Sequence, residues 1–290
     1  MSNWINNLQL QTDQLTKSPD FIGLANWESN MDMSQWQTKF SGTAYGSVYY
    51  ATSGDKPFVP QKLDGPLVPV KTLYHESADG NLREGDSQTK YQIPIQILFN
   101  SSRWTHQKSA SIAIYDGTQR DDGTLTSTRT IVGASFKNIE THKTANVFAS
   151  NYPHTGKGAP QFSGTTGTEA QINGWYDKIT GVIGNSPDQI IFMSDTNLYN
   201  FNSADAKPMA SVPTKMKATG STDTLLEHLK TCCTGESPRW KFLYDVIAYA
   251  GFGSTTVAGG YALTKELMND DSTLQGDHPH MPIYLTVKIA

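Results

Sequence analysis

The chain contains 290 residues, with 27 acidic against 23 basic side chains, which gives a formal net charge of −4 at pH 7. Phosphate backbones are bound through clustered Lys and Arg, so this charge balance argues against nucleic acid as a main partner. Charged residues make up only 17% of the chain, below the roughly 25% that is typical of soluble domains. This composition favours a β-rich protein with many turns.

The N-terminus has no basic segment followed by an apolar one, so no secretory signal peptide is visible. We expect a protein that is made in soluble form and then stays where it is made, is released by another route or is packaged. The two cysteines, Cys232 and Cys233, are neighbours. Their Cα atoms are too close together for a normal internal disulfide.

Residues 1–42 are predicted to form a helical and aromatic arm. Apolar residues near helical spacing indicate a short amphipathic helix over 3–17. Trp4, Trp27 and Trp36 stand among polar residues along the arm, and tryptophan is enriched at protein interfaces. These three tryptophans are therefore the candidate interface or binding residues, with the alternative that the arm only covers the core.

Residues 43–151 are predicted to form a β-rich region. A strand is expected over 43–54, and the prolines that follow restrict the next segment to a linker or a sheet edge. The polar segment 75–88 is predicted to be a loop. Apolar and polar residues then alternate in runs that begin near 92, 109, 130 and 147. The loops between these runs are too short for a crossover helix, so the strands should pair antiparallel.

Residues 152–290 are predicted to form a mixed region that packs with the β-rich region as one large domain. Apolar periodicity indicates a helix over 169–183, a buried strand over 189–193 and a helix over 223–231. A further helix is expected from Ser237, because serine before proline is a favourable helix start. The predicted fold class is α+β, an antiparallel β-sheet core with several helices that lie mostly in the C-terminal half.

A run of 19 residues from Val246 to Thr264 carries no charge. A membrane-spanning helix needs about 20 mainly apolar residues, and four glycines with a Ser-Thr-Thr triplet interrupt this run, so we predict no constitutive transmembrane span. The favoured interpretation is a helix, a glycine turn and a second helix. The alternative is a hairpin that inserts into membranes under some conditions. The membrane-insertion candidates are Val246, Ile247, Phe252, Val257 and Leu263.

Asp277, His278 and His280 form a dense cluster of residues that suits metal binding or catalysis. On an extended chain, His-x-His projects both rings to one side, as zinc coordination can require. The alternation of the strand that follows places both histidines toward solvent if it extends back to them. The cluster is therefore retained as a metal-site candidate beside the alternative of a solvated turn.

Other motifs that carry chemistry are absent from the sequence. The segment Asp195–Asp205 resembles a calcium loop only superficially, because Tyr199 and Asn200 occupy its fifth and sixth places. We interpret it as an Asn-rich turn. No nucleophile elbow and no phosphate-binding loop occurs, so no catalytic residue and no cofactor is predicted.

Composition and the lack of a catalytic motif together favour a non-enzymatic protein that works through its surface. We expect either a toxin-like protein, membrane-active and able to bind target cells, or a subunit of a virion-like particle. Its predicted partners are a cell surface, a membrane or copies of itself in a homo-oligomer. The alternative is a hydrolase, with or without metal, that uses the cluster of Asp277, His278 and His280.

Overall fold

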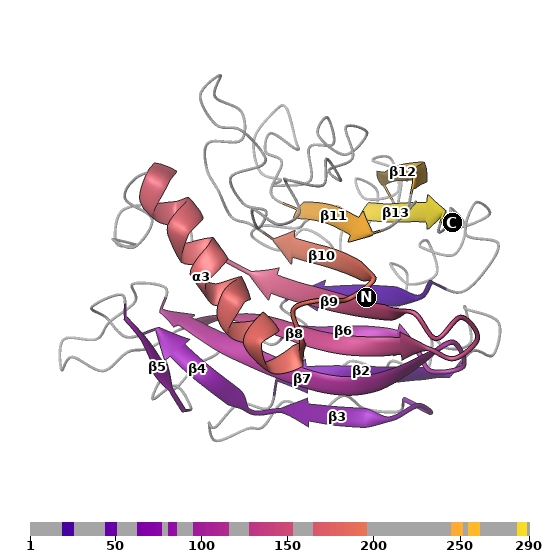
Figure 1. The fold of residues 1–290 in the computed structure, drawn as a ribbon, viewed down its shortest axis with the longest axis horizontal. Helices are drawn as coiled ribbons and strands as arrows, with labels where there is room; N and C mark the ends of the chain where they lie inside the picture. Colours follow the sequence, from indigo (N-terminus) through magenta and orange to yellow (C-terminus); the bar gives the residue numbers. More distant parts are fainter. Residues whose placement is uncertain are drawn as a thin grey trace, which may run out of the picture.

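The computed structural model describes thirteen strands and one helix within residues 19–25, 44–50, 63–76, 81–85, 95–115, 128–152, 165–195, 245–251, 255–261 and 283–288. Most of the strands belong to two sheets that lie face to face (Figure 1). In chain order the elements are β1 (Phe21–Ala25), β2 (Tyr45–Tyr50), β3 (Leu67–Val70), β4 (Thr72–Glu76), β5 (Leu82–Glu84), β6 (Ile95–Asn100), β7 (Trp104–Tyr115), β8 (Thr128–Asn138), β9 (Thr144–Asn151), α3 (Thr165–Ile183), β10 (Gln189–Asp195), β11 (Asp245–Gly251), β12 (Thr255–Tyr261) and β13 (Ile283–Lys288).

The smaller of the two sheets has four strands in the order β1-β6-β2-β3. β6 pairs antiparallel with both β1 and β2, and β3 pairs parallel with β2 at the edge. Pro69 in β3 cannot donate a backbone hydrogen bond, which suits an edge strand. The prediction that the proline-rich segment is limited to a sheet edge is therefore confirmed for β3.

The larger sheet has seven strands in the order β11-β10-β9-β8-β7-β4-β5. The predicted antiparallel pairing is confirmed for β7, β8 and β9. β10, however, pairs parallel with β9 and β4 pairs parallel with β7, so the sheet is mixed and not purely antiparallel. α3 lies in the connection between β9 and β10, because two parallel strands can be joined only by a long crossover segment.

Two further sequence predictions about strands are corrected. β6 does not pair with β7, although a short turn joins them, because the two strands belong to different sheets. The polar segment 75–88 is not only a loop, since it contains β5 and the end of β4, which pair antiparallel. A turn can connect two packed sheets as readily as two paired strands, and sequence alternation does not distinguish these cases.

The larger sheet separates two apolar cores, so the described residues form three layers: α3, the seven-stranded sheet and the four-stranded sheet (Figure 1). The predicted helix over 169–183 is confirmed as α3, and its residues Tyr176, Ile179 and Ile183 are buried against the sheet. Between the two sheets lies a core of β-branched and aromatic side chains. Its members include Val48, Ile95, Ile97, Phe99, Val132, Phe136 and Val147.

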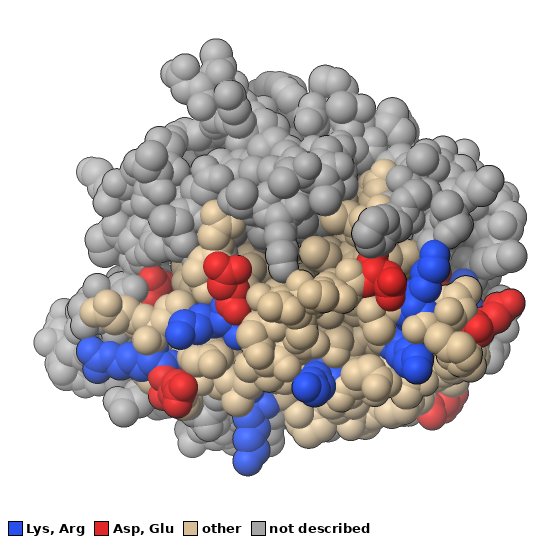
Figure 2. Space-filling model, viewed as in Figure 1, with Lys and Arg blue, Asp and Glu red and all other residues tan. Residues whose placement is uncertain are grey.

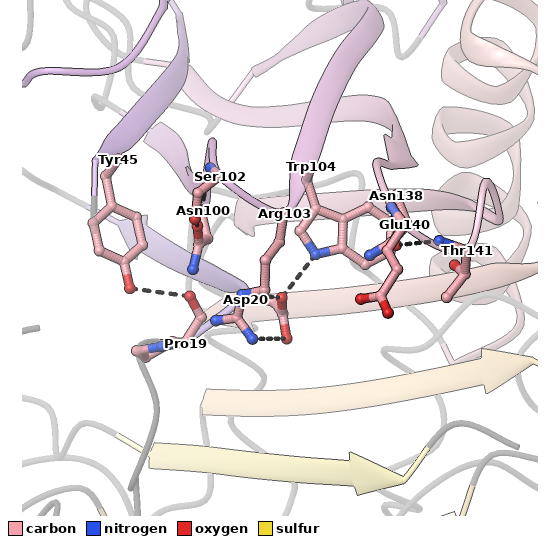
Figure 3. A network of polar contacts seen from close by, with 10 residues as sticks. All are labelled: Pro19, Asp20, Tyr45, Asn100, Ser102, Arg103, Trp104, Asn138, Glu140 and Thr141. Atoms are coloured by element: carbon pink, nitrogen blue, oxygen red, sulfur yellow. Dashed lines mark hydrogen bonds and ion pairs between the residues drawn. The ribbon is translucent and has the colours of Figure 1, made fainter. Parts of the chain in front are cut away.

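A polar contact network fixes the start of β1 against the turn between β6 and β7 (Figure 3). Trp104 Nε1 donates to Asp20 Oδ1 at 2.8 Å, and Arg103 Nε lies 3.2 Å from the same oxygen. The Tyr45 hydroxyl donates to the carbonyl oxygen of Pro19 at 3.0 Å. β1 lies within the segment 1–42 and is bound to the smaller sheet through β6.

The helices predicted around the uncharged run are wrong. Residues 245–251 form β11, which pairs along its whole length with β10, and residues 255–261 form β12, which pairs with β13. Ala248 and Ala250 of β11 are buried in the apolar core on the α3 side of the sheet, so this part of the run belongs to the core of the structure. The expected helices over 3–17 and 223–231 lie outside the described residues.

Candidate functional site

Several strands of the larger sheet end at the same place. β4, β7, β9 and β10 share one direction, while β5, β8 and β11 run the opposite way. The carboxyl ends of the first four strands therefore lie beside the beginnings of the other three, at the end where the arrowheads of β9 and β10 lie in Figure 1. We call this edge the carboxyl end of the sheet. It gathers side chains from positions far apart in the sequence.

The last residues of β9 and β10, Asn151 and Asp195, lie opposite each other in register. Asn151 Nδ2 donates to Asp195 Oδ2 at 2.9 Å, and Arg129 Nη1 donates to Asn151 Oδ1 at 3.1 Å. Guanidinium only donates and carboxylate only accepts, so this pair of partners fixes the orientation of the Asn151 amide. Asn151 and Asp195 are both buried, which makes them a positioned polar pair inside the fold.

A second carboxylate adjoins this pair. Asp245, the first residue of β11, lies opposite Asp195 in the antiparallel register. Residues opposite each other on paired strands point to the same face of the sheet, and like charges in that position repel. A bound cation would relieve this repulsion. Carboxylate oxygens are also the ligands that hard divalent cations prefer, so Asp195 and Asp245 fit such an ion.

Thr130 adds an unsatisfied polar atom beside the pair. Its hydroxyl is fully buried and has no hydrogen-bond partner among the described residues. Ile131 pairs with Ser150, so one step further along the antiparallel register Thr130 adjoins Asn151. Leaving a buried hydroxyl unpaired costs about 1–3 kcal/mol, and such atoms call for a water or a ligand. Thr130 therefore marks this end of the sheet as a place where a polar ligand would be stabilised.

Four hydroxyl groups lie on the other face of the same strand ends, toward α3. The hydroxyls of Ser150 and Ser194 are 2.7 Å apart, and those of Tyr152 and Tyr176 are 3.4 Å apart. Burial raises the pKa of both tyrosines well above the ordinary value. Both phenols therefore remain neutral hydrogen-bonding groups throughout the physiological pH range. We call these four residues the hydroxyl cluster.

The site candidates from the sequence analysis are only partly covered by the structure. Val246 and Ile247 belong to β11 and Val257 belongs to β12, where they are part of paired strands. The others lie outside the described residues: Trp4, Trp27, Trp36, Phe252, Leu263, Asp277, His278 and His280. Within the described ranges, no three His, Cys, Asp or Glu residues lie close enough together to hold a metal ion. Asp195 and Asp245 supply two carboxylates there.

Sequence reasoning did not identify Asn151, Asp195 or Arg129 as site residues. Asp195 was interpreted as the start of an Asn-rich turn, because the segment was compared only with a calcium loop. The predicted buried strand over 189–193 is confirmed as part of β10. The available signal was that Asp195 directly follows this strand after a helical crossover, since ligands commonly bind at the carboxyl ends of parallel strands.

No protein-family model matches the sequence, and no curated protein matches it. Solved structures do match in fold over nearly the whole chain. One is a mannosyl-6-phosphatase of Bacteroides thetaiotaomicron, with a TM-score of 0.56, 11% identity and coverage of 99% of this chain and 92% of that one. Another is TDP2 of D. rerio in complex with a single-strand DNA product, with a TM-score of 0.52, 14% identity and coverage of 99% and 92%.

A third matching structure is described as an endonuclease/exonuclease/phosphatase from Bacteroides vulgatus. Its TM-score is 0.51, its identity is 9%, and the match covers 99% of this chain and 91% of that chain. At this level of identity the similarity establishes the fold. The chain therefore has an endonuclease/exonuclease/phosphatase-like α/β sandwich, a finer description than the α+β class expected from the sequence.

These matches correct the functional prediction made from composition. A fold shared along the whole chain with enzymes contradicts a non-enzymatic, toxin-like or virion-like protein, and with it the expected pore formation and self-assembly. The exclusion of nucleic acid and the preference for a cell surface, a membrane or copies of itself as partners are corrected as well, because one matching structure contains a DNA product. Net charge averages over the whole surface, so it does not report on a single site.

On the face seen in Figure 2, basic and acidic side chains are intermixed among other residues. Among the described residues, no helix has both the length and the apolarity needed to cross a membrane.

Proposed function

We propose that this protein is a hydrolase of phosphate esters, with its active site at the carboxyl end of the seven-stranded sheet. The observation that carries the proposal is the row formed by Asn151, Asp195 and Asp245 on three adjacent strands, with Arg129 bound to Asn151. The similarity in fold to a mannosyl-6-phosphatase and to an endonuclease/exonuclease/phosphatase supports the same reaction class.

In this proposal Asp195 and Asp245 hold a hard divalent cation such as Mg²⁺ or Mn²⁺. When bound, such a cation stabilises charge on a phosphoryl oxygen and lowers the pKa of a coordinated water. Asn151 keeps the Asp195 carboxylate oriented through its 2.9 Å hydrogen bond, and Arg129 fixes Asn151 in turn. The unpaired hydroxyl of Thr130 offers a further polar contact for a ligand beside them.

The cluster of Asp277, His278 and His280 is the candidate source of the proton-transferring groups. It precedes β13 in the sequence, and β13 contacts β11, which begins with Asp245. An imidazole has an unperturbed pKa near neutrality and is the commonest general acid or base. We therefore propose that one of the two histidines takes part in the reaction at the site built around Asp195.

Hydrolysis of a nitrophenyl phosphate monoester and of the matching diester, with Mg²⁺, Mn²⁺ or a chelator, tests the proposal. Cation-dependent turnover is expected from the wild type. Asp195→Asn keeps the shape of the side chain but removes its charge, and should lower kcat/KM by about 100-fold or more. Asp177→Asn is the matched control, because Asp177 is an exposed carboxylate on α3 and its loss should leave turnover unchanged.

Thermal unfolding with Mn²⁺ provides a second readout. A cation present at 100 times its Kd stabilises the folded state by about 2.7 kcal/mol, so the midpoint should rise for the wild type and for Asp177→Asn but not for Asp195→Asn. His278→Ala and His280→Ala then show which imidazole is needed. Wild-type protein that hydrolyses neither ester with any cation would overturn the proposal, as would full activity in Asp195→Asn.

A further inference from the structure

The hydroxyl cluster lies in a layer that is otherwise apolar. Ser150, Ser194, Tyr152 and Tyr176 are buried between the seven-stranded sheet and α3, among aromatic and aliphatic side chains such as Trp175. Burying polar groups in such a layer is unfavourable unless they hydrogen-bond to one another. Phenylalanine and alanine would fill nearly the same volumes, so hydrophobic packing alone does not account for four hydroxyls at one place.

The two serines of the hydroxyl cluster lie directly beside residues of the candidate site in β9 and β10. Ser150 immediately precedes Asn151 on β9, and Ser194 immediately precedes Asp195 on β10. Side chains alternate between the faces of a strand, so each serine faces α3 while the site residue after it faces the opposite layer. The 2.7 Å contact between the two serine hydroxyls therefore ties β9 to β10 one residue before the pair of Asn151 and Asp195.

The two tyrosines extend this tie beyond the ends of the strands. The backbone N–H of Tyr152 donates to the carbonyl oxygen of Asp195 at 2.9 Å, which continues the pairing past Asn151. The Tyr152 hydroxyl then meets the hydroxyl of Tyr176 on α3. The Tyr176 ring is held by Phe148 and Phe192, with ring centroids 4.7 Å and 5.4 Å away. Tyr152 thus links the helix to the end of β9 and, through its own backbone hydrogen bond, to the end of β10.

We propose that the hydroxyl cluster is the positioning device of the candidate site. By joining the ends of β9 and β10 to each other and to α3, it keeps Asn151 Nδ2 within hydrogen-bond distance of Asp195 Oδ2. A shift of one residue between the strands would move every side chain to the other face, so the register at this point decides whether the site exists. The expected loss of catalysis rests on the proposed function, whereas the expected change in the contact between Asn151 and Asp195 does not.

Tyr176→Phe is the main test, because it removes one hydroxyl and keeps the ring that packs on Phe148 and Phe192. Groups that orient metal ligands change metal affinity or activity by about 10–100-fold when they are removed. We expect kcat to fall about 10-fold with little change in KM, and Mn²⁺ affinity measured by calorimetry to weaken by a similar factor. Tyr74→Phe is the control, since Tyr74 packs against the same helix beneath Lys178.

The side-chain amide of Asn151 gives a readout that does not depend on catalysis. Its NMR signals can be assigned by their loss in Asn151→Ser, and in Tyr176→Phe they should shift and exchange their hydrogens faster, whereas Tyr74→Phe should leave them unchanged. Ser194→Ala should act like Tyr176→Phe. Its control is Ser111→Ala, because Ser111 is a buried serine of the same sheet whose hydroxyl donates to the Lys71 carbonyl at 3.0 Å.

The outcomes separate the two proposals. An altered Asn151 signal in Tyr176→Phe together with an inactive wild type supports the positioning role and overturns the proposed function. An unchanged signal and unchanged Mn²⁺ affinity overturn the positioning role, even if Tyr176→Phe lowers the unfolding midpoint, because loss of stability alone is what a purely structural hydroxyl would produce. Equal effects of Tyr176→Phe and Tyr74→Phe on the Asn151 signal also overturn it.

Discussion

Replacing Gly133 by alanine tests how closely α3 is seated on the seven-stranded sheet. Gly133 lies within β8 opposite Phe148, on the face that the helix covers. A Cβ added there would overlap Ile179 Cγ2 and would lie 2.9 Å from two ring carbons of Phe148. Carbon atoms pack at about 3.5–4.0 Å. Ile179 and Phe148 are both buried, so neither can retreat into solvent and the helix or the strand must move.

The expected loss of stability is the difference between two opposing contributions to the free energy of unfolding. Inserting a methyl group into a packed core costs about 1–3 kcal/mol. Replacing glycine by alanine restricts the unfolded chain, which favours folding by about 0.4–1 kcal/mol. The overpacking term is larger, so the free energy of unfolding should fall by about 1–2 kcal/mol. For a chain of this size each kcal/mol lowers the midpoint of thermal unfolding by about 2–4 °C.

Urea denaturation followed by circular dichroism measures this loss, and second-site variants identify its cause. Ile179→Leu lacks the methyl group that Cβ would overlap, whereas Ile179→Val retains it. Each double variant is compared with the single variant that carries the same change at Ile179. Beside Ile179→Leu, Gly133→Ala should therefore cost at most half of the stability that it costs in the wild type, whereas beside Ile179→Val it should cost more than half. If Gly133→Ala is as stable as the wild type, or if both second-site changes restore it equally, the steric argument fails.

Two further predictions concern the opposite end of the sandwich. Asp20→Ala should lower the free energy of unfolding by about 1–3 kcal/mol, because the buried indole N–H of Trp104 loses its acceptor. Arg103→Ala should lower it by at most about 1 kcal/mol, because that ion pair is partly exposed; equal losses in urea denaturation would contradict this ranking. Hydrogen bonds from the Thr144 backbone N–H and hydroxyl lower the pKa of Asp188. The depressed pKa stabilises the fold above the unfolded-state value of about 3.9, and this contribution disappears as the pH falls through the folded-state pKa. Asp188→Asn should therefore be less stable than the wild type at pH 7, and the difference, followed by thermal melts from pH 7 to pH 2.5, should shrink below about pH 4; a difference independent of pH would show that the charge is not involved.

β7, β8 and β9 could be predicted from the sequence, because the alternation of apolar and polar residues along a strand indicates which side chains are buried. Ile112 of β7 and Val132 of β8 are buried as expected, and the apolar residues on one face of α3 also recur at helical spacing in the sequence. β11 could not be recognised in this way. Ile247 and Ala248 fit a helical spacing as well as a strand, and a short apolar run is ambiguous between the two. The pairing of β11 with β10 decides its structure.

The candidate site could not be predicted, because its residues are brought together only by the pairing of strands that are far apart in the sequence. Asn151 and Asp195 are 44 positions apart in the sequence, and their contact depends on the parallel pairing of β9 with β10. Periodicity shows which face of a strand is buried, but it does not show which strand lies beside it. The same limit explains why composition led to the wrong functional class, since a few buried polar residues barely change the average properties of 290 residues.

The crossover through α3 has a consequence for the order in which the molecule acquires its structure. β7, β8 and β9 are neighbours both in sequence and in space, and local pairings of this kind form quickly. β10 and β11 can join only after long intervening segments have been brought back. We therefore expect Asn151 to belong to the part of the sheet that forms early and Asp195 to a strand that is added later. Partial opening at this side of the sheet would separate the two residues while most of the hydrophobic interior stayed intact.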